Sequence, residues 1–170
     1  MMLKSVLSAI DVTSDWSGKI VSFLFYVGIG MLVYEVVLRY LFNAPTIWAH
    51  SMTQRLFAVY YVLLGAYTLR QGAHVRIDAI YNKFSVRTRA ILDMVTSVLF
   101  FLFCGLLLWK GIDFAMTSIE QREKDNSVFN APIYHVKIML PVGALLIILQ
   151  GLANFIRNFA TAVTGRQYEH

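Results

Sequence analysis

Four apolar segments, each long enough to form a membrane-spanning helix, dominate the pattern of hydrophobic and polar positions along the chain. A bilayer core of roughly 30 Å is crossed by about 20 predominantly apolar helical residues. Extended to the nearest charges and turn signals, the apolar runs predict an all-α, polytopic membrane protein with four transmembrane helices. We expect these helices over residues 18–42, 48–70, 90–116 and 133–157.

A shorter periodic pattern precedes the first of these helices. Leu3, Val6, Leu7 and Ile10 recur at helical spacing, with polar and charged side chains between them. This pattern is typical of an amphipathic helix that lies in the plane of the membrane surface. We therefore expect residues 1–16 to form a short N-terminal interfacial helix, not a cleaved signal peptide, within a single membrane domain.

Composition supports a membrane location. Hydrophobic residues make up 58% of the 170 positions and charged residues only 15%, and the mean hydropathy is +0.59. The formal net charge is +5. In a membrane protein basic residues mainly reflect the orientation of the chain and not an anionic ligand, so nucleic acid is not an expected partner. The single cysteine, Cys104, can form neither a disulfide framework nor a thiolate metal site.

The loop between the second and third predicted helices carries most of the basic residues that indicate the orientation of the chain in the membrane. Its only acid is Asp78, and its basic residues are Arg70, Arg76, Lys83, Arg87 and Arg89. Because basic loops remain in the cytoplasm, this loop is expected inside. The segment between the third and fourth helices has three acids and two bases and is expected in the periplasm. Both termini would then be cytoplasmic, in a multi-pass protein of a bacterial inner membrane.

Charged residues within the predicted helices are the first candidates for function. Glu35 and Arg39 are four residues apart and share a helix face. Arg55 lies at a similar depth on the next helix, and we expect Glu35 to pair with it as well. The cluster could be an ion or proton site, a structural polar clamp, or a charged contact with another subunit. One acid facing two arginines is better described as neutralised than as a titrating carrier, which favours the last two readings.

Other polar and small residues suggest packing or weak cofactor sites. His50 and His135 fall at outer helix ends, where a four-helix bundle could hold a haem, but their aromatic neighbours indicate an interfacial belt instead. Pro141 predicts a kink in the last helix. The glycines expected to permit close helix approach are Gly28, Gly30, Gly143 and Gly151. The sequence contains no nucleotide loop, catalytic carboxylate pair or metal-ligand spacing, so we expect no enzyme activity and no cofactor.

Several strings of the sequence resemble the small membrane subunit (DctQ-type) of tripartite ATP-independent periplasmic (TRAP) transporters. They are EVVLRYLFNAPTIW at 35–48, LGAYTLR at 64–70, GAHVRID at 72–78, PIYHVKIMLPVG at 132–143 and LQG at 149–151. Their order and spacing are specific and cover most of the chain between the first and last helices. The departure is at His50 and Ser51, where many family members have acidic residues.

The resemblance implies sodium-driven uptake of a small organic anion. A periplasmic binding protein would deliver the anion to a complex of this chain with a large permease subunit, which would hold both sodium and substrate. This chain would act as the scaffold. The string at 48–50 resembles a subgroup associated with small organic anions such as oxo acids, so the cargo is expected to be an oxo acid, another carboxylate, a sulfonate or a sugar acid.

Three groups of residues are assigned on the charges and the resemblance together. Residues expected at the subunit interface, or at lipid that bridges it, are Glu35, Arg39, Trp48, Arg55, Lys137 and Gln150. Residues expected to stabilise the inner membrane boundary are Arg70, His74, Arg76 and Asp78. The expected docking patch for the binding protein lies within Glu120–Asn130 and includes Glu120, Arg122, Glu123, Lys124 and Asp125.

Two other functions are compatible with four helices. A stand-alone, proton-coupled carrier of the small multidrug type would use the membrane carboxylate Glu35, although Arg39 and Arg55 would repel cationic drugs. A haem-bearing electron-transfer subunit would use the two histidines named above.

Overall fold

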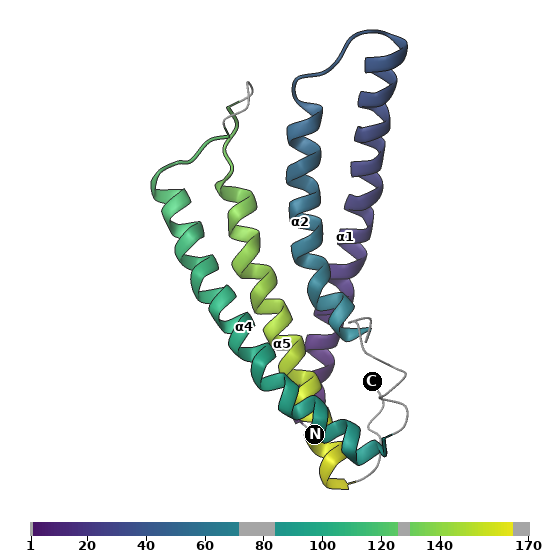
Figure 1. Ribbon diagram of the computed structural model, residues 1–170, viewed down its shortest axis with the longest axis vertical. Coiled ribbons are helices and arrows are strands. Elements are labelled where there is room, and N and C mark those ends of the chain that lie inside the picture. Colours follow the sequence, from purple (N-terminus) through teal and green to yellow (C-terminus); the bar gives the residue numbers. More distant parts are fainter. Residues whose placement is uncertain (1, 72–83, 126–129, 165–170) are drawn as a thin grey trace.

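The computed structural model describes residues 2–71, 84–125 and 130–164 (Figure 1). Within them the chain forms four α-helices, α1 (Met2–Leu41), α2 (Ala49–Arg70), α4 (Val86–Glu120) and α5 (Tyr134–Thr164). The helices form two antiparallel hairpins, α1–α2 and α4–α5, that lie side by side. The all-α class is confirmed for this part of the chain. Following the predicted orientation, we call the end with the 41–49 and 120–134 connections the outer end, and the opposite end the inner end.

Three of the described helices are long and apolar enough to cross a membrane. These spans are Ser5–Leu41, Arg87–Glu120 and Tyr134–Thr164. The helix α2 has 22 residues but is not among them, because polar residues such as Gln54 and Arg55 occupy its first two turns. Its membrane crossing and the orientation of the chain therefore stay predictions.

The first helix differs from the prediction. The structure does not confirm a separate interfacial helix over 1–16, because α1 is one unbroken helix of 40 residues. Gly18, at the expected boundary, is buried and makes room for the ring of Tyr67 instead of ending the helix. The third and fourth predicted helices are also longer than expected, since a helix backbone continues past the charges at which a hydropathy pattern stops.

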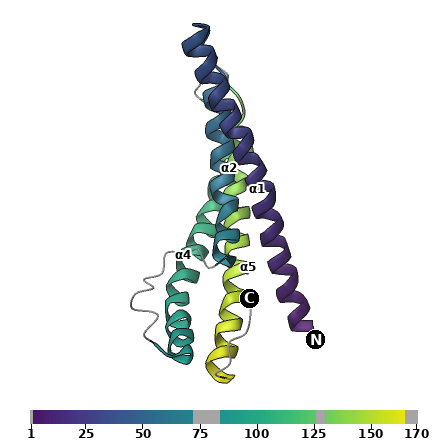
Figure 2. The same ribbon diagram turned by 90° about the vertical axis from the view of Figure 1, so that its right-hand side faces the viewer.

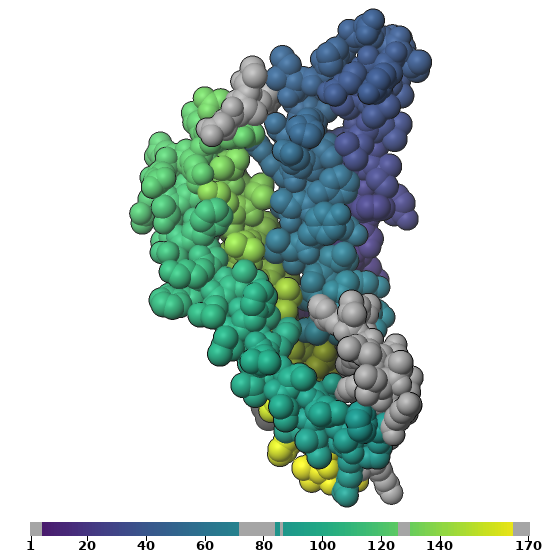
Figure 3. Space-filling view, viewed as in Figure 1, coloured from purple at the N-terminus to yellow at the C-terminus, as the bar shows by residue number. Residues whose placement is uncertain are grey.

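The helices pack in an open row and not in a closed four-helix bundle. Helix α5 contacts the other three, α2 lies between α1 and α5, and α4 packs almost entirely on α5. Toward the inner end, α1 and α4 lie on opposite sides of α5 (Figure 2). In the space-filling view α4 forms one edge of the molecule (Figure 3), and Leu99 on α4 is 71% exposed. The faces of α1 and α4 that point away from the other helices are thus left for lipid or for other proteins.

Glycines allow close approach between several pairs of helices. A Cβ atom added at Gly143 would lie 2.8 Å from the backbone oxygen of Val62 and closer still to its side chain. Gly151 is equally tight against the ring of Phe100, and Gly28 is close to Phe57, as the sequence predicted. Gly30 is different, because a Cβ there would meet no atom within 4 Å.

We predict that Gly143→Ala destabilises the protein. The added methyl group meets backbone atoms of α2 that cannot rotate away, and overpacking of this kind costs about 1–3 kcal/mol. Heating the purified protein in detergent and measuring the fraction that stays monodisperse tests this. Gly105→Ala is the matched control, because Gly105 is also helical but has no atom within 4 Å of the added Cβ. Equal melting temperatures for the two variants would contradict the prediction.

Candidate functional site

Two acids and two arginines meet near the inner end, where α1, α2 and α5 come together. Asp11 on α1 pairs with Arg157 on α5, and a carboxylate oxygen of Asp11 lies 3.8 Å from Nε of Arg70 on α2. Asp15 pairs with the same Arg70. Two negative and two positive charges cancel, which lowers the cost of placing them at the edge of a membrane.

Gln150 connects these charges to the helix core. Its side chain is fully buried, accepts a hydrogen bond from the Ser14 hydroxyl at 2.7 Å and donates one to Asp11 at 3.2 Å. Asn154, one turn further along α5, donates to the carbonyl of Leu69 at 3.4 Å. We call the whole set the inner network; its members are Asp11, Ser14, Asp15, Arg70, Gln150, Asn154 and Arg157.

Sequence reasoning found only part of this network. The sequence predicts Arg70 at the inner boundary but does not identify Asp11, Asp15 and Arg157. The available signal was the four-residue spacing of the two acids, which places them on one helix face. Gln150 was assigned to an interface, but its partners lie within this chain. The other predicted residues of the inner boundary, His74, Arg76 and Asp78, lie outside the described residues.

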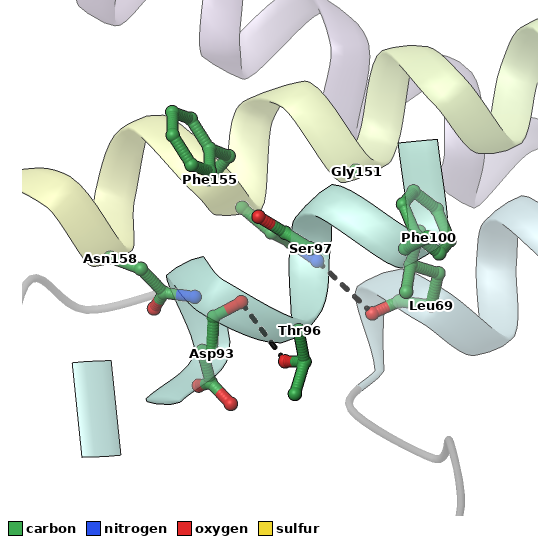
Figure 4. A pocket seen from close by; sticks show the side chains of 9 residues that line it. Leu69, Asp93, Thr96, Ser97, Phe100, Gly151, Phe155 and Asn158 are labelled. Carbon is green, nitrogen blue, oxygen red and sulfur yellow. Dashed lines mark hydrogen bonds between the residues drawn. The ribbon is translucent and has the colours of Figure 1, made fainter. Parts of the chain in front are cut away.

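A cavity of about 290 Å³ opens beside the inner network (Figure 4). It forms because α2 ends at Arg70 while α4 and α5 continue toward the inner end. The hydroxyls of Thr96 and Ser97 on its wall donate to carbonyls of their own helix, at 3.1 Å to Asp93 and 2.6 Å to Met94. In the described parts of the chain, no group of three or more His, Cys, Asp or Glu side chains could hold a metal ion.

At the outer end, two ion pairs tie the segment after α4 to α2 and α5. Arg55 donates to Asp125 at 2.9 Å and to the carbonyl of Ala131 at 3.3 Å. Lys137 pairs with Glu123. We call these five residues the outer latch. Together with the inner network, the latch links the two hairpins at both ends of the molecule.

The predicted pairing of Glu35 with Arg55 is wrong. Glu35 instead accepts hydrogen bonds from Arg39 at 2.6 Å and from the backbone N–H of Thr46 at 3.1 Å, and also from the Thr46 hydroxyl. The loop between α1 and α2 folds back over Glu35, with Asn43 in a left-handed conformation at φ 49°. The acid therefore acts as a polar clamp of this loop, which is one of the two readings that the sequence favoured.

Some residues of the predicted docking patch have partners within the chain, and others are exposed. Glu123 and Asp125 are engaged in the outer latch, whereas Glu120, Arg122 and Lys124 are exposed. Residues 126–129 of that segment lie outside the described residues. Trp48 is 38% exposed, and its ring centroid lies 6.3 Å from that of Tyr34. Contacts of these residues with other proteins or with lipid stay predictions.

We predict that breaking the ion pair between α1 and α5 destabilises the protein. Asp11→Asn leaves Arg157 without its ion pair, and the loss of one partner of a buried pair costs on the order of 3 kcal/mol. The double variant Asp11→Asn/Arg157→Gln removes both charges and should cost less than the sum of the single changes. Thermal unfolding in detergent measures both effects. Strictly additive losses would show that the two side chains do not interact.

The outer latch should make stability depend on pH. The hydrogen bond from Lys137 lowers the pKa of Glu123 below its ordinary value of 4.5. A lowered pKa stabilises the folded state above the ordinary value, and this contribution is lost as the pH falls through the pKa of the folded state. The wild type should therefore lose more stability than Glu123→Gln between pH 7 and acidic pH, as measured by melting temperature. Glu120→Gln, a change at an exposed acid, should behave like the wild type.

The comparison with known families agrees with this architecture. Residues 28–161 match the family described as tripartite ATP-independent periplasmic transporters, DctQ component. No curated protein matches the chain significantly. The matched region includes α2, α4 and most of α5, with the whole outer latch and the inner-network residues of α2 and α5. Because the match covers well over half of the sequence, the chain belongs to the DctQ family of small membrane subunits of TRAP transporters.

Proposed function

We propose that this chain is the scaffold subunit of a TRAP transporter, which supports the large permease subunit during sodium-coupled, binding-protein-dependent uptake of a small organic anion. The observation that carries the proposal is the internal pairing of the charges at both ends of the molecule. Asp11, Glu35 and Arg55 all have partners in the chain. Such charges hold helices together and are poorly suited to moving an ion.

The two linked ends favour a rigid part of a carrier over a moving one. Arg55 of the outer latch and Arg70 of the inner network lie 15 positions apart on α2, a distance of about 22 Å along the helix axis. Near these two points the pairs Arg55–Asp125 and Arg157–Asp11 join the two hairpins, and they resist sliding of one hairpin past the other. A platform of this kind suits the static part of an elevator-type carrier, whose mobile part would be in the large subunit.

The state of Glu35 argues against a proton-coupled multidrug carrier. A coupling carboxylate must exchange protons or ligand during each cycle. The side chain of Glu35 is only 10% exposed and accepts three hydrogen bonds from Arg39 and Thr46. A group held in this way suits a fixed structural role.

The cargo and the coupling ion are proposed from the family alone. We infer that sodium and substrate bind to the large subunit and that this chain holds no cofactor. The string Trp48-Ala49-His50 supports a small organic anion, such as an oxo acid, another carboxylate, a sulfonate or a sugar acid, because it resembles the subgroup associated with such cargo.

We predict that transport needs the complete complex. Liposomes that contain this chain and the large subunit, supplied with the binding protein and an inward sodium gradient, should accumulate a labelled organic anion. Liposomes with this chain alone should not. A thermal-shift screen of the binding protein against candidate anions selects the label.

Two outcomes would contradict the scaffold function. One is uptake of the anion by this chain alone. The other is proton-coupled efflux of a cationic dye by this chain alone that disappears in Glu35→Gln, which would restore the carrier hypothesis.

A further inference from the structure

The outer half of α4 carries a stripe of polar side chains on its exposed face. We call it the α4 stripe; its members are Lys110, Asp113, Thr117 and Glu120, and all four are exposed. Their spacing of three, four and three residues places them in one line along the helix. On the opposite side, Gly111 packs against Leu140 and Pro141 of α5, and Ala115 and Ser118 of the same face are buried. The stripe therefore points away from the rest of the chain.

Two charges of the stripe, Lys110 and Asp113, lie inside both the predicted membrane helix 90–116 and the candidate span Arg87–Glu120. Lys110 is six positions before residue 116, the predicted outer end of the membrane helix, which is a distance of about 9 Å along the helix axis. Large apolar side chains surround it, among them Trp109 at 65% exposure and Ile112 at 48%. The depth and the neighbours place Lys110 and Asp113 below the level of the membrane surface.

Neither charge has an ion pair among the described residues. The ammonium of Lys110 lies over the ring of Trp109, 5.1 Å from its centroid, and the Thr117 hydroxyl donates to the backbone carbonyl of Asp113, not to its carboxylate. The other charges near the membrane ends differ, since Arg55 and Asp11 have partners in this chain. Charged side chains within membrane spans nearly always face protein or water and not lipid.

We propose that the α4 stripe is the contact surface for a membrane-spanning helix of the large permease subunit, which presents an acid to Lys110 and a base to Asp113. The proposal rests on the scaffold function and names the surface through which that function is exercised. It differs from the interface expected from sequence, because Glu35, Arg55 and Gln150 all have partners within this chain.

Depth and charge select this partner over two others. The soluble binding protein could reach Glu120 but not Lys110, which lies about 15 Å further into the membrane. A second copy in the same membrane has the same orientation, so its two-fold axis runs along the membrane normal. That symmetry brings Lys110 level with Lys110 and Glu120 level with Glu120, which repel, and only the contact of Lys110 with Asp113 of the other copy, about 4.5 Å apart in depth, offsets this repulsion.

Photo-crosslinking in the intact complex tests the surface directly. A genetically encoded crosslinker at Thr117 lies in the stripe, whereas one at Ile119 lies at nearly the same depth but about 160° around the helix. Ile119 is 41% exposed, so it is a fair control. We expect a product with the large subunit from Thr117 and not from Ile119. A product between two copies of this chain, or with the large subunit from Ile119 alone, would overturn the α4 stripe as the interface.

Apolar substitution separates a protein contact from a lipid contact. For a stripe that faces the large subunit, Lys110→Leu/Asp113→Leu should reduce the amount of co-purified large subunit at least about tenfold, because charges on the partner lose their counterions. For a stripe that faces lipid, the same variant should leave the complex intact or raise its yield, and this would overturn the proposal. Lys19→Leu is the control, since exposed Lys19 also lies over a tryptophan ring, 5.6 Å from the centroid of Trp16.

The same experiment distinguishes this proposal from the scaffold function. A wild-type chain that retains the large subunit, combined with an unaffected Lys110→Leu/Asp113→Leu variant, rejects the α4 stripe alone. A wild-type chain that never retains the large subunit rejects both proposals. The amount of inserted chain is measured in parallel, so that a loss of complex is not confused with a loss of the variant itself.

Discussion

The ion pairs of Asp11 with Arg157 and of Asp15 with Arg70 are the interactions on which the rest of the structure depends. A polar group at the edge of a membrane must be satisfied by other protein groups, because lipid offers none. At the inner end, three helices satisfy one another. This requirement draws the N-terminal part of α1 against α5 and α2, and it explains why α1 continues as one helix instead of turning along the membrane surface.

The open row of helices follows from where the small and polar residues lie. Helix α5 has buried small residues such as Gly143 and Ala153 and the buried amide of Gln150, so other helices can approach it on several sides. Helix α4 approaches one of these sides and shares little else with the chain. In such a subunit α5 is tightly packed at the centre, and one face of α4 stays uncovered. An uncovered helix face is what a subunit needs to pack against a larger membrane protein.

Helix identity and family were predictable, whereas the partners of individual charges were not. The strings around Glu35 and Pro141 are local features that indicate the DctQ family, and the family match over 28–161 agrees with them. The expected pairing of Glu35 with Arg55 is wrong, because a similar position along two neighbouring helices does not make two side chains partners. In the structure the loop residue Thr46 occupies one side of Glu35, and Arg55 reaches Asp125, which is 70 positions away in the sequence.

The sequence by itself determined the helical segments, the membrane location and the family, because apolar runs, turn residues and characteristic strings belong to a chain in any conformation. The tertiary structure alone decided which charges are cancelled and which face outward. That outcome depends on the register between the two hairpins, which close contacts such as Gly143 with Val62 set. In this register Asp11, Asp15, Arg55, Arg70 and Arg157 find partners within the chain, whereas Lys110 and Asp113 of α4 stay at its edge.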